Sequence, residues 1–134
     1  MTDPNAGTSG PPLAVVADDD ELIRTVLRFA LESLGITVLE ASTGAAAVAA
    51  VHSNPVDLVI LDVRFPGETF EQTWVNLCAA RLPQPAIIVL SGDAAGPAET
   101  HGPLVEFLHK PVDFAELEAS IARLLPTSLP RGTQ

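Results

Sequence analysis

Short apolar segments alternate along the chain with segments whose apolar residues recur at helical spacing. The apolar segments are rich in β-branched residues and span residues 13–17, 36–41, 56–62, 86–92 and 104–109. Short continuous apolar runs are typical of strands that are buried on both faces of a parallel sheet. The pattern therefore predicts five strands, all of them buried on both faces.

The segments between the predicted strands favour helices to different degrees. Residues 21–34 place apolar side chains on one helical face, residues 44–52 are rich in alanine, and residues 113–125 give a clear last helix. A weaker helix is expected over residues 69–81. The connection over residues 93–103 contains two glycines and two prolines, which disfavour more than about a turn or two of helix. We therefore expect a short or irregular fourth helix there.

Strands that alternate with helices predict the α/β class and a doubly wound parallel sheet, because right-handed crossovers place helices on both faces. The 134 residues are enough for one domain with a substantial core. We expect this domain over residues 13–125, with a disordered N-terminal tail over residues 1–12 and a flexible C-terminal tail over residues 126–134. The first twelve residues lack the positive and apolar regions of a signal peptide.

Composition and charge narrow the classes of function. No apolar run approaches the ~20 residues that cross a bilayer, so we expect no membrane insertion and a cytoplasmic location. Cys78 is the only cysteine, which excludes an internal disulfide and a multi-cysteine metal site. The net charge of −10 argues against direct binding of nucleic acid, because phosphate contacts need clustered lysine and arginine.

Polar residues stand at the ends of four of the five predicted strands. Asp18 and Asp19 follow the first strand, Asp62 ends the third, Ser91 lies at the end of the fourth and Lys110 follows the fifth. In an open parallel sheet, ligands bind beyond the carboxyl ends of the strands, so we expect these side chains to share one rim. Lys110 is the only lysine among seven basic residues, which favours a specific need for a compact ammonium.

The acidic run Asp18, Asp19 and Asp20 concentrates negative charge at the first strand end. Carboxylates a few ångströms apart repel by about 4 kcal/mol at an effective dielectric near 20. One acid is explained as the N-cap of the following helix, and a solvated acidic turn is one explanation for the others. A divalent cation is the other explanation. Asp19 and Asp62 can share Mg²⁺, which prefers a couple of carboxylates together with water and phosphate oxygens.

Phosphoryl transfer is the chemistry that these groups fit. Asp62 would supply a nucleophilic carboxylate, Ser91 a hydrogen-bond donor and Lys110 a positive charge around the phosphoryl group. Attack by a carboxylate would give an acyl phosphate. The crowded acids are then interpreted as a cation site that draws in the phosphoryl group.

Four segments together resemble the response-regulator receiver domain, the phosphoacceptor module of two-component signalling. They are VVADDDELIR, DLVILDVRFPG, IIVLSG and FLHKPVD, which occur in the family's order within residues 13–125. The resemblance implies a flavodoxin-like sheet with the strand order 2-1-3-4-5. In this order the third strand lies between the first and the fourth, so Asp62 would lie between the acidic pair and Ser91.

The resemblance also implies roles in a metal site. Asp62 would be the phosphoacceptor and would share Mg²⁺ with Asp19, a direct ligand. Asp18 would help mostly through bound water. The backbone carbonyl of Arg64 would be the protein's remaining metal ligand.

Further implied roles concern signalling. Ser91 and Phe107 would be the switch pair, and Lys110 would contact the phosphoryl group. A plain core aromatic is the alternative for Phe107, because it lies on an apolar strand. Phe70 stands where the family usually has glycine, and the interval from Ser91 to Lys110 is a few residues short. For Trp74 we expect packing rather than recognition.

The resemblance implies a histidine kinase or a histidine phosphotransfer protein as phosphoryl donor, and an output through contact with an unidentified downstream protein. The domain would be no enzyme beyond its part in its own phosphorylation and dephosphorylation. A small haloacid-dehalogenase-like phosphatase is an alternative, with Asp18 as nucleophile. Its basis is the pair Asp18 and Asp20 after a strand, followed by Ser91 and Lys110, which resembles that family's order. A degenerate receiver that only binds partners is a third possibility.

Overall fold

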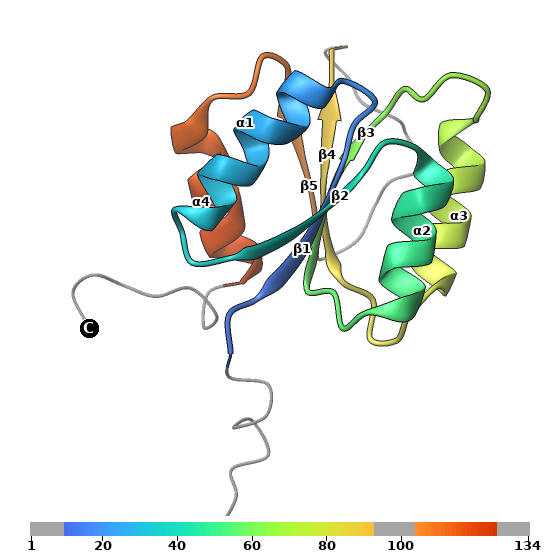
Figure 1. Ribbon diagram of the computed structural model, residues 1–134, viewed down its shortest axis with the longest axis horizontal. Helices are drawn as coiled ribbons and strands as arrows, with labels where there is room; N and C mark the ends of the chain where they lie inside the picture. Colours follow the sequence, from blue (N-terminus) through green and yellow to red (C-terminus); the bar gives the residue numbers. More distant parts are fainter. Residues whose placement is uncertain (1–9, 93–103, 126–134) are drawn as a thin grey trace, which may run out of the picture.

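Five parallel strands form one sheet in the computed structural model, which describes residues 10–92 and 104–125 (Figure 1). The strand order is β2-β1-β3-β4-β5, and every pairing is parallel. The strands are β1 (Leu13–Ala17), β2 (Thr37–Ala41), β3 (Leu58–Asp62), β4 (Ala86–Ser91) and β5 (Val105–His109). The predicted α/β class and the flavodoxin-like strand order are confirmed.

Helices cover both faces of this sheet. They are α1 (Glu21–Glu32), α2 (Gly44–Ser53), α3 (Phe70–Ala79) and α4 (Phe114–Leu124). Figure 1 shows α1 and α4 on one face of the sheet and α2 and α3 on the other. Each forms within a few residues of the predicted bounds, and α4 corresponds to the predicted last helix. None of the helices in the described part of the chain is long and apolar enough to cross a membrane.

Three of the predicted segments fall wholly or partly outside the described residues. The short helix expected over residues 93–103 and the tail over residues 126–134 lie outside, as do the first nine residues of the other tail. Within the described part, β1 begins and α4 ends on the same side of the sheet, opposite the carboxyl ends of the strands (Figure 1).

Two apolar cores lie on opposite faces of the sheet, because successive side chains of a strand point to opposite sides. On β3, Leu58 and Ile60 join the core beside α1 and α4, whereas Val59 and Leu61 join the core beside α2 and α3. β3 and β4 are buried at every position. Asp62 is the one charged residue within these two strands, so its burial calls for an explanation by pairing or by function.

The two edge strands differ from the prediction. β2 and β5 each pair with a single neighbour in the described sheet, and most of their residues are partly or fully exposed. The prediction that all five strands are buried on both faces is therefore wrong for β2 and β5. Phe107 on β5 is 43% exposed, which also excludes its interpretation as a plain core aromatic. An apolar run by itself does not distinguish an edge strand from a central one.

Side chains cap the starts of the helices and explain part of the acidic run. The Asp20 carboxylate accepts hydrogen bonds from the backbone N–H groups of Leu22 and Ile23 at the start of α1. Asp20 therefore serves as the N-cap, and neither Asp18 nor Asp19 is needed to cap α1.

The position at which the family usually has glycine opens a helix here. Phe70 is the first residue of α3, and its ring stacks on that of Trp74 with the ring centroids 5.8 Å apart. Trp74 is buried and belongs to the core beside α2 and α3, in agreement with the packing role expected for it.

Candidate functional site

Three acidic side chains meet at the carboxyl edge of β1 and β3. Asp18, Asp19 and Asp62 each offer a carboxylate oxygen, and these oxygens lie within 4.8 Å of one another. Asp18 is 1% exposed and Asp62 is 5% exposed, whereas Asp19 is exposed. Because charges of one sign repel more strongly where water is excluded, this cluster requires positive charge nearby.

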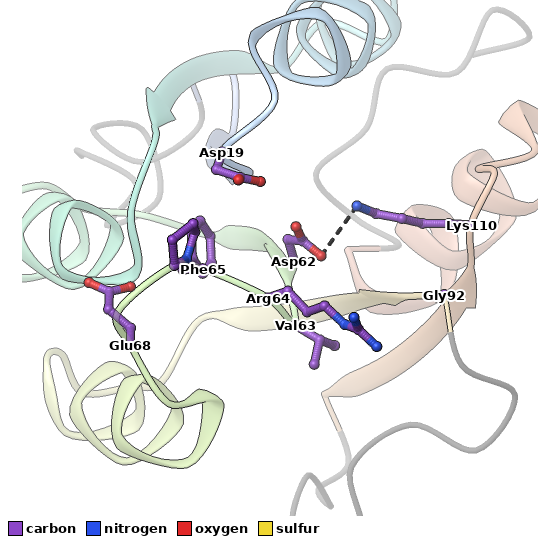
Figure 2. Close-up of a pocket in the computed structure, with 9 residues that line it drawn as sticks. Asp19, Asp62, Val63, Arg64, Phe65, Glu68, Gly92 and Lys110 are labelled. Carbon is purple, nitrogen blue, oxygen red and sulfur yellow. Dashed lines mark ion pairs between the residues drawn. The ribbon is translucent and has the colours of Figure 1, made fainter.

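Lys110 supplies positive charge from within the protein. Its Nζ lies 3.2 Å from Asp18 Oδ2 and 3.2 Å from Asp62 Oδ1. Figure 2 shows the lysine side chain directed at Asp62 across the pocket. The backbone N–H of Lys110 donates to the carbonyl of Ser91 at 2.9 Å, which extends the pairing of β4 with β5 to the point where the lysine leaves the sheet.

The pKa values reflect this crowding. Burial raises the pKa of Asp62 above its ordinary value, the charge of Asp18 raises it further, and Lys110 opposes both effects. Burial alone would lower the pKa of Lys110, but Asp62 and Asp18 outweigh it and hold that pKa above its ordinary value. One ammonium does not balance three carboxylates, so the rim attracts further positive charge.

The backbone around Asp18 is held in place from several directions. Its N–H donates to the carbonyl of Ala41 at 3.1 Å, and its carboxylate Oδ1 accepts the N–H of Asp20 at 2.9 Å. Arg24 Nη1 donates to the Asp18 carbonyl at 2.7 Å, and Arg24 Nε pairs with Glu40 Oε1 at 3.1 Å. The local sequence pattern does not predict this role of Arg24, because its partners lie on a turn and on β2 rather than at helical spacing.

An open pocket of about 760 Å³ lies in front of Asp62 (Figure 2). The loop that follows β3 provides most of its wall, and the lining residues are Asp19, Asp62, Val63, Arg64, Phe65, Pro66, Glu68, Gly92 and Lys110. A Cβ atom at Gly92 would meet nothing within 4 Å, so the pocket wall is open at this position. The pocket is therefore open to a ligand of phosphoryl size at its acidic end.

Of the remaining predicted residues, some line this pocket and others do not. Arg64 lines it, and Ser91 is buried at the end of β4 directly before Gly92. Phe107 lies two residues before His109, which pairs with Ser91, and it lines a separate hollow with residues of α4. The structure thus brings the acids and Lys110 together and leaves Phe107 outside the pocket.

Glu68 lines the pocket but was not singled out from the sequence. Its carboxylate accepts hydrogen bonds from the backbone N–H groups of Gly44 and Ala45, which lie 24 and 23 residues earlier in the chain. A contact across that separation leaves no local sequence pattern. The only available signal was its place directly after the Pro66-Gly67 turn, on the loop that leaves β3.

The donor set can hold a hard divalent cation. Carboxylate oxygens are ligands that Mg²⁺ prefers, and Mg²⁺ keeps water or phosphate oxygens in its other positions. Asp19 and Asp62 both line the open pocket, which gives such oxygens access. The three acidic residues therefore form a donor set that fits Mg²⁺.

Comparisons with known sequences point to one family. A model of the response regulator receiver domain matches residues 14–122. The chain is 33% identical over 122 residues to the transcriptional regulatory protein FixJ of Azorhizobium caulinodans, covering 89% of this chain and 57% of that protein. It is 32% identical over 114 residues to the DNA-binding transcriptional regulator NtrC of Escherichia coli, covering 82% of this chain and 24% of that protein. The chain spans only part of the length of both relatives.

Solved structures of receiver domains are also similar to this chain. A response regulator receiver protein from Sinorhizobium medicae is similar with a TM-score of 0.76 and 26% identity, covering 88% of this chain and 97% of that chain. A response regulator receiver domain protein from Clostridium thermocellum is similar with a TM-score of 0.75 and 26% identity, covering 86% and 94%.

Proposed function

The chain belongs to the family of response regulator receiver domains of two-component systems, and from this premise we propose that it accepts a phosphoryl group on Asp62. The proposed donor is a histidine kinase or a histidine phosphotransfer protein. The observation that supports this most directly is the position of Asp62. Its buried carboxylate lines the open pocket, 3.2 Å from Lys110 Nζ and beside Asp18 and Asp19.

In the proposed step, an oxygen of the ionised Asp62 carboxylate attacks the phosphorus of a phosphohistidine whose other ring nitrogen carries a proton. A P–O bond forms as the P–N bond breaks, and the bonding electrons leave with the ring nitrogen of a neutral imidazole. The ammonium of Lys110 offsets charge on the phosphoryl oxygens. Mg²⁺ bound at the rim would supply further neutralisation and orient those oxygens.

The contacts of Asp18 and Asp19 support different roles for them at the metal site. Both carboxylate oxygens of Asp18 already have partners, because Oδ1 accepts the N–H of Asp20 and Oδ2 pairs with Lys110. Asp18 would therefore act on the cation mostly through water. Asp19, which is exposed at the rim, would be the direct ligand together with Asp62 and the backbone carbonyl of Arg64.

The proposed output is contact with a downstream protein. The Ser91 hydroxyl would donate a hydrogen bond to the phosphoryl group. Phe107 would transmit the effect of phosphorylation on β5, where its side chain is already exposed. The partner is not identified, and no direct contact with nucleic acid is proposed. The proposed location is the cytoplasm, as expected from the sequence.

An apolar groove between α1 and α4 supports docking of the phosphoryl donor. Its exposed side chains are Leu22, Val26 and Phe29 on α1 and Phe114 on α4. The groove continues as far as Lys110, the residue that pairs with Asp62. A donor seated there would hold its phosphohistidine beside the pocket. We call these four residues and the hollows that they line the α1–α4 groove.

Changing Phe29 to serine should slow transfer from a phosphorylated histidine donor about tenfold, because truncating one of the few residues that anchor an interface costs more than about 1 kcal/mol. Phosphorylation by acetyl phosphate should stay within about twofold, since that small donor needs no docking surface. The donor is the kinase that transfers fastest in a profile of the source organism's histidine kinases. Val75→Ser, at an exposed site on α3, is the matched control. Equal slowing with both donors would exclude the groove as a docking surface.

Covalent trapping tests the proposed function itself. The protein is incubated with acetyl phosphate and Mg²⁺, reduced with borohydride and mapped by peptide mass spectrometry. We expect the label on Asp62 and none in Asp62→Ala. Label on Asp18, or undiminished labelling of Asp62→Ala, would overturn the proposal and favour the phosphatase alternative, whose nucleophile would be Asp18. Against that alternative, Asp18 is 1% exposed and both of its oxygens are engaged.

A further inference from the structure

The loop after β3 is tied to the start of α2 by one side chain. Glu68 Oε1 accepts the N–H of Gly44 at 2.7 Å, and Glu68 Oε2 accepts the N–H of Ala45 at 3.1 Å. The next amide of the helix, that of Ala46, donates to the hydroxyl of Thr43 at 3.0 Å. The first N–H groups of a helix lack acceptors within the helix. Glu68 provides acceptors for the two N–H groups that the Thr43 hydroxyl does not bind. The cap of α2 is therefore shared between its own chain segment and the loop.

Gly44 allows this close approach. A Cβ atom at position 44 would lie 2.7 Å from Glu68 Oε1 and 2.5 Å from Thr73 Oγ1. Thr73 is buried on α3, so it has little freedom to move away. Any larger residue at position 44 would therefore displace the Glu68 carboxylate and would also press on the Thr73 side chain.

The loop between Asp62 and Glu68 is also fixed at other points. The N–H of Val63 donates to the carbonyl of Leu90 at 3.1 Å, and the N–H of Glu68 donates to the carbonyl of Phe65 at 3.1 Å. Arg64 lies between these two anchors and lines the pocket. The contact of Glu68 with α2 is the one that joins the far end of this loop to a different helix.

The charge of Glu68 also favours its contact with the start of α2. Glu68 lines the pocket that holds Asp19 and Asp62, and Figure 2 shows it at the end of the pocket away from Lys110. Bound to α2, its carboxylate faces the positive end of the helix dipole. Released, it would add a fourth negative charge with freedom to approach the acidic cluster.

We propose that Glu68 is a positioning residue, which fixes the loop from Asp62 to Glu68 by capping α2 and thereby sets the affinity of the rim for Mg²⁺. The inference rests on the proposed function, because the same rim is the phosphoryl site. Glu68 itself contacts neither the cation nor the phosphoryl group in this role. Its effect passes through the backbone of Arg64 and Asp62.

Amide hydrogen exchange in metal-free protein tests the capping contact without reference to function. Exchange of the Gly44 and Ala45 amides should become at least about tenfold faster in Glu68→Ala, because both lose a bond to a charged acceptor. Glu68→Gln keeps one acceptor oxygen and should give an intermediate rate. Glu71→Gln removes the same charge from an exposed site on α3 and should leave both amides unchanged. Unchanged exchange in Glu68→Ala would overturn the proposal.

Titration with Mg²⁺, followed by amide chemical shifts, tests the effect on the rim. Glu68→Ala should bind Mg²⁺ about tenfold more weakly, the lower end of what residues behind the direct ligands contribute. Gly44→Ala keeps the charge of Glu68 but expels its carboxylate from α2, so it should weaken binding by a similar factor. The double variant should bind Mg²⁺ no more weakly than Gly44→Ala alone, because Gly44→Ala has already broken the contact of Glu68 with α2.

The outcomes separate position from charge. Weaker binding in Glu68→Ala with normal binding in Gly44→Ala, while both show fast amides, would assign the effect to charge and overturn the proposal. Fast amides with Mg²⁺ affinity unchanged in both variants would overturn it as well. At saturating Mg²⁺, phosphorylation by acetyl phosphate should return to the wild-type rate. A persistent loss would show that Glu68 does not act through the affinity for Mg²⁺ and would overturn the proposal. If the wild-type protein bound neither Mg²⁺ nor beryllofluoride, the proposed function would fail, and amide exchange would still decide whether Glu68 caps α2.

Discussion

Replacing Asp19 with asparagine is expected to weaken Mg²⁺ binding by more than about a hundredfold, beyond the 10–100-fold that residues behind the direct ligands contribute. Asp19 is the exposed member of the acidic cluster, while Asp18 is already engaged by Lys110 and by the N–H of Asp20. Removing its charge leaves Asp62 as the only accessible carboxylate of the three. Titration followed by amide shifts, or by the fluorescence of Trp74, measures the change.

The chain offers a closely matched control for this prediction. Asp20→Asn removes the same charge one residue away, and asparagine caps a helix about as well as aspartate does. Because Asp20 caps α1 rather than joining the cluster, this variant should retain its affinity within about twofold. Mg²⁺ binding in Asp19→Asn at the wild-type level would exclude Asp19 as a ligand. Equal losses in both variants would show that only net charge at the rim matters.

Replacing Lys110 with methionine is expected to lower the free energy of unfolding by about 2–3 kcal/mol at pH 7 without Mg²⁺. Methionine fills a similar volume but leaves Asp18 and Asp62 buried and facing each other without the ammonium. Removing one partner of a fully buried ion pair lowers the free energy of unfolding by somewhat more. The Lys110 side chain is 26% exposed, so solvent screens part of the repulsion that its loss leaves between the two carboxylates. Urea denaturation in the presence of a chelator measures it.

The pH dependence of this loss follows from the pKa of Asp62. That pKa is already raised by burial and by Asp18, and Lys110 is the main group that lowers it, so the variant raises it further. Between the ordinary value of 3.8 and the raised value, the folded state binds more protons than the unfolded state, so stability falls as pH rises. Both proteins lose stability up to their own folded-state pKa of Asp62, which is higher in the variant. The deficit of Lys110→Met should therefore be small in acid and grow as pH rises between these two pKa values.

A double variant makes this prediction specific. Because the pKa of Lys110 is itself raised, its ammonium stays charged throughout the range from acid to neutral pH. Adding Asp62→Asn to Lys110→Met should restore most of the lost stability, since one of the two facing charges is then gone. A deficit that is the same at every pH, or that persists in the double variant, would show that Lys110 acts through packing alone.

The sequence predicts the central strands, and the edge where the acids and Lys110 meet, because both depend on local pattern. β3 and β4 are continuous apolar runs, and each ends in a polar residue, Asp62 or Ser91. Parallel pairing brings the ends of neighbouring strands to one edge, so the order of residues along the chain was enough to predict a shared rim. The acids and Lys110 do meet there.

Other features depend on contacts that the local pattern does not contain. The exposure of Phe107 follows from the place of β5 at the edge of the sheet, whereas its apolar neighbours predicted burial. The division of the acidic run into the cap Asp20 and the rim residue Asp19 depends on the backbone of one turn. The contact between Glu68 and Gly44 joins segments 24 residues apart. These three features can be identified only from the folded structure.

The start of β1 and the end of α4 lie on the side of the sheet opposite the pocket (Figure 1). In a sheet of parallel strands this arises when the chain enters with a strand and leaves with a helix, since the helix returns to the side from which the strands start. The protein can therefore be fixed to a solid support, or joined to a fluorescent protein, near Leu13 or beyond Leu124 with Asp62 still facing the bulk solution. Kinase binding can then be measured on an oriented surface.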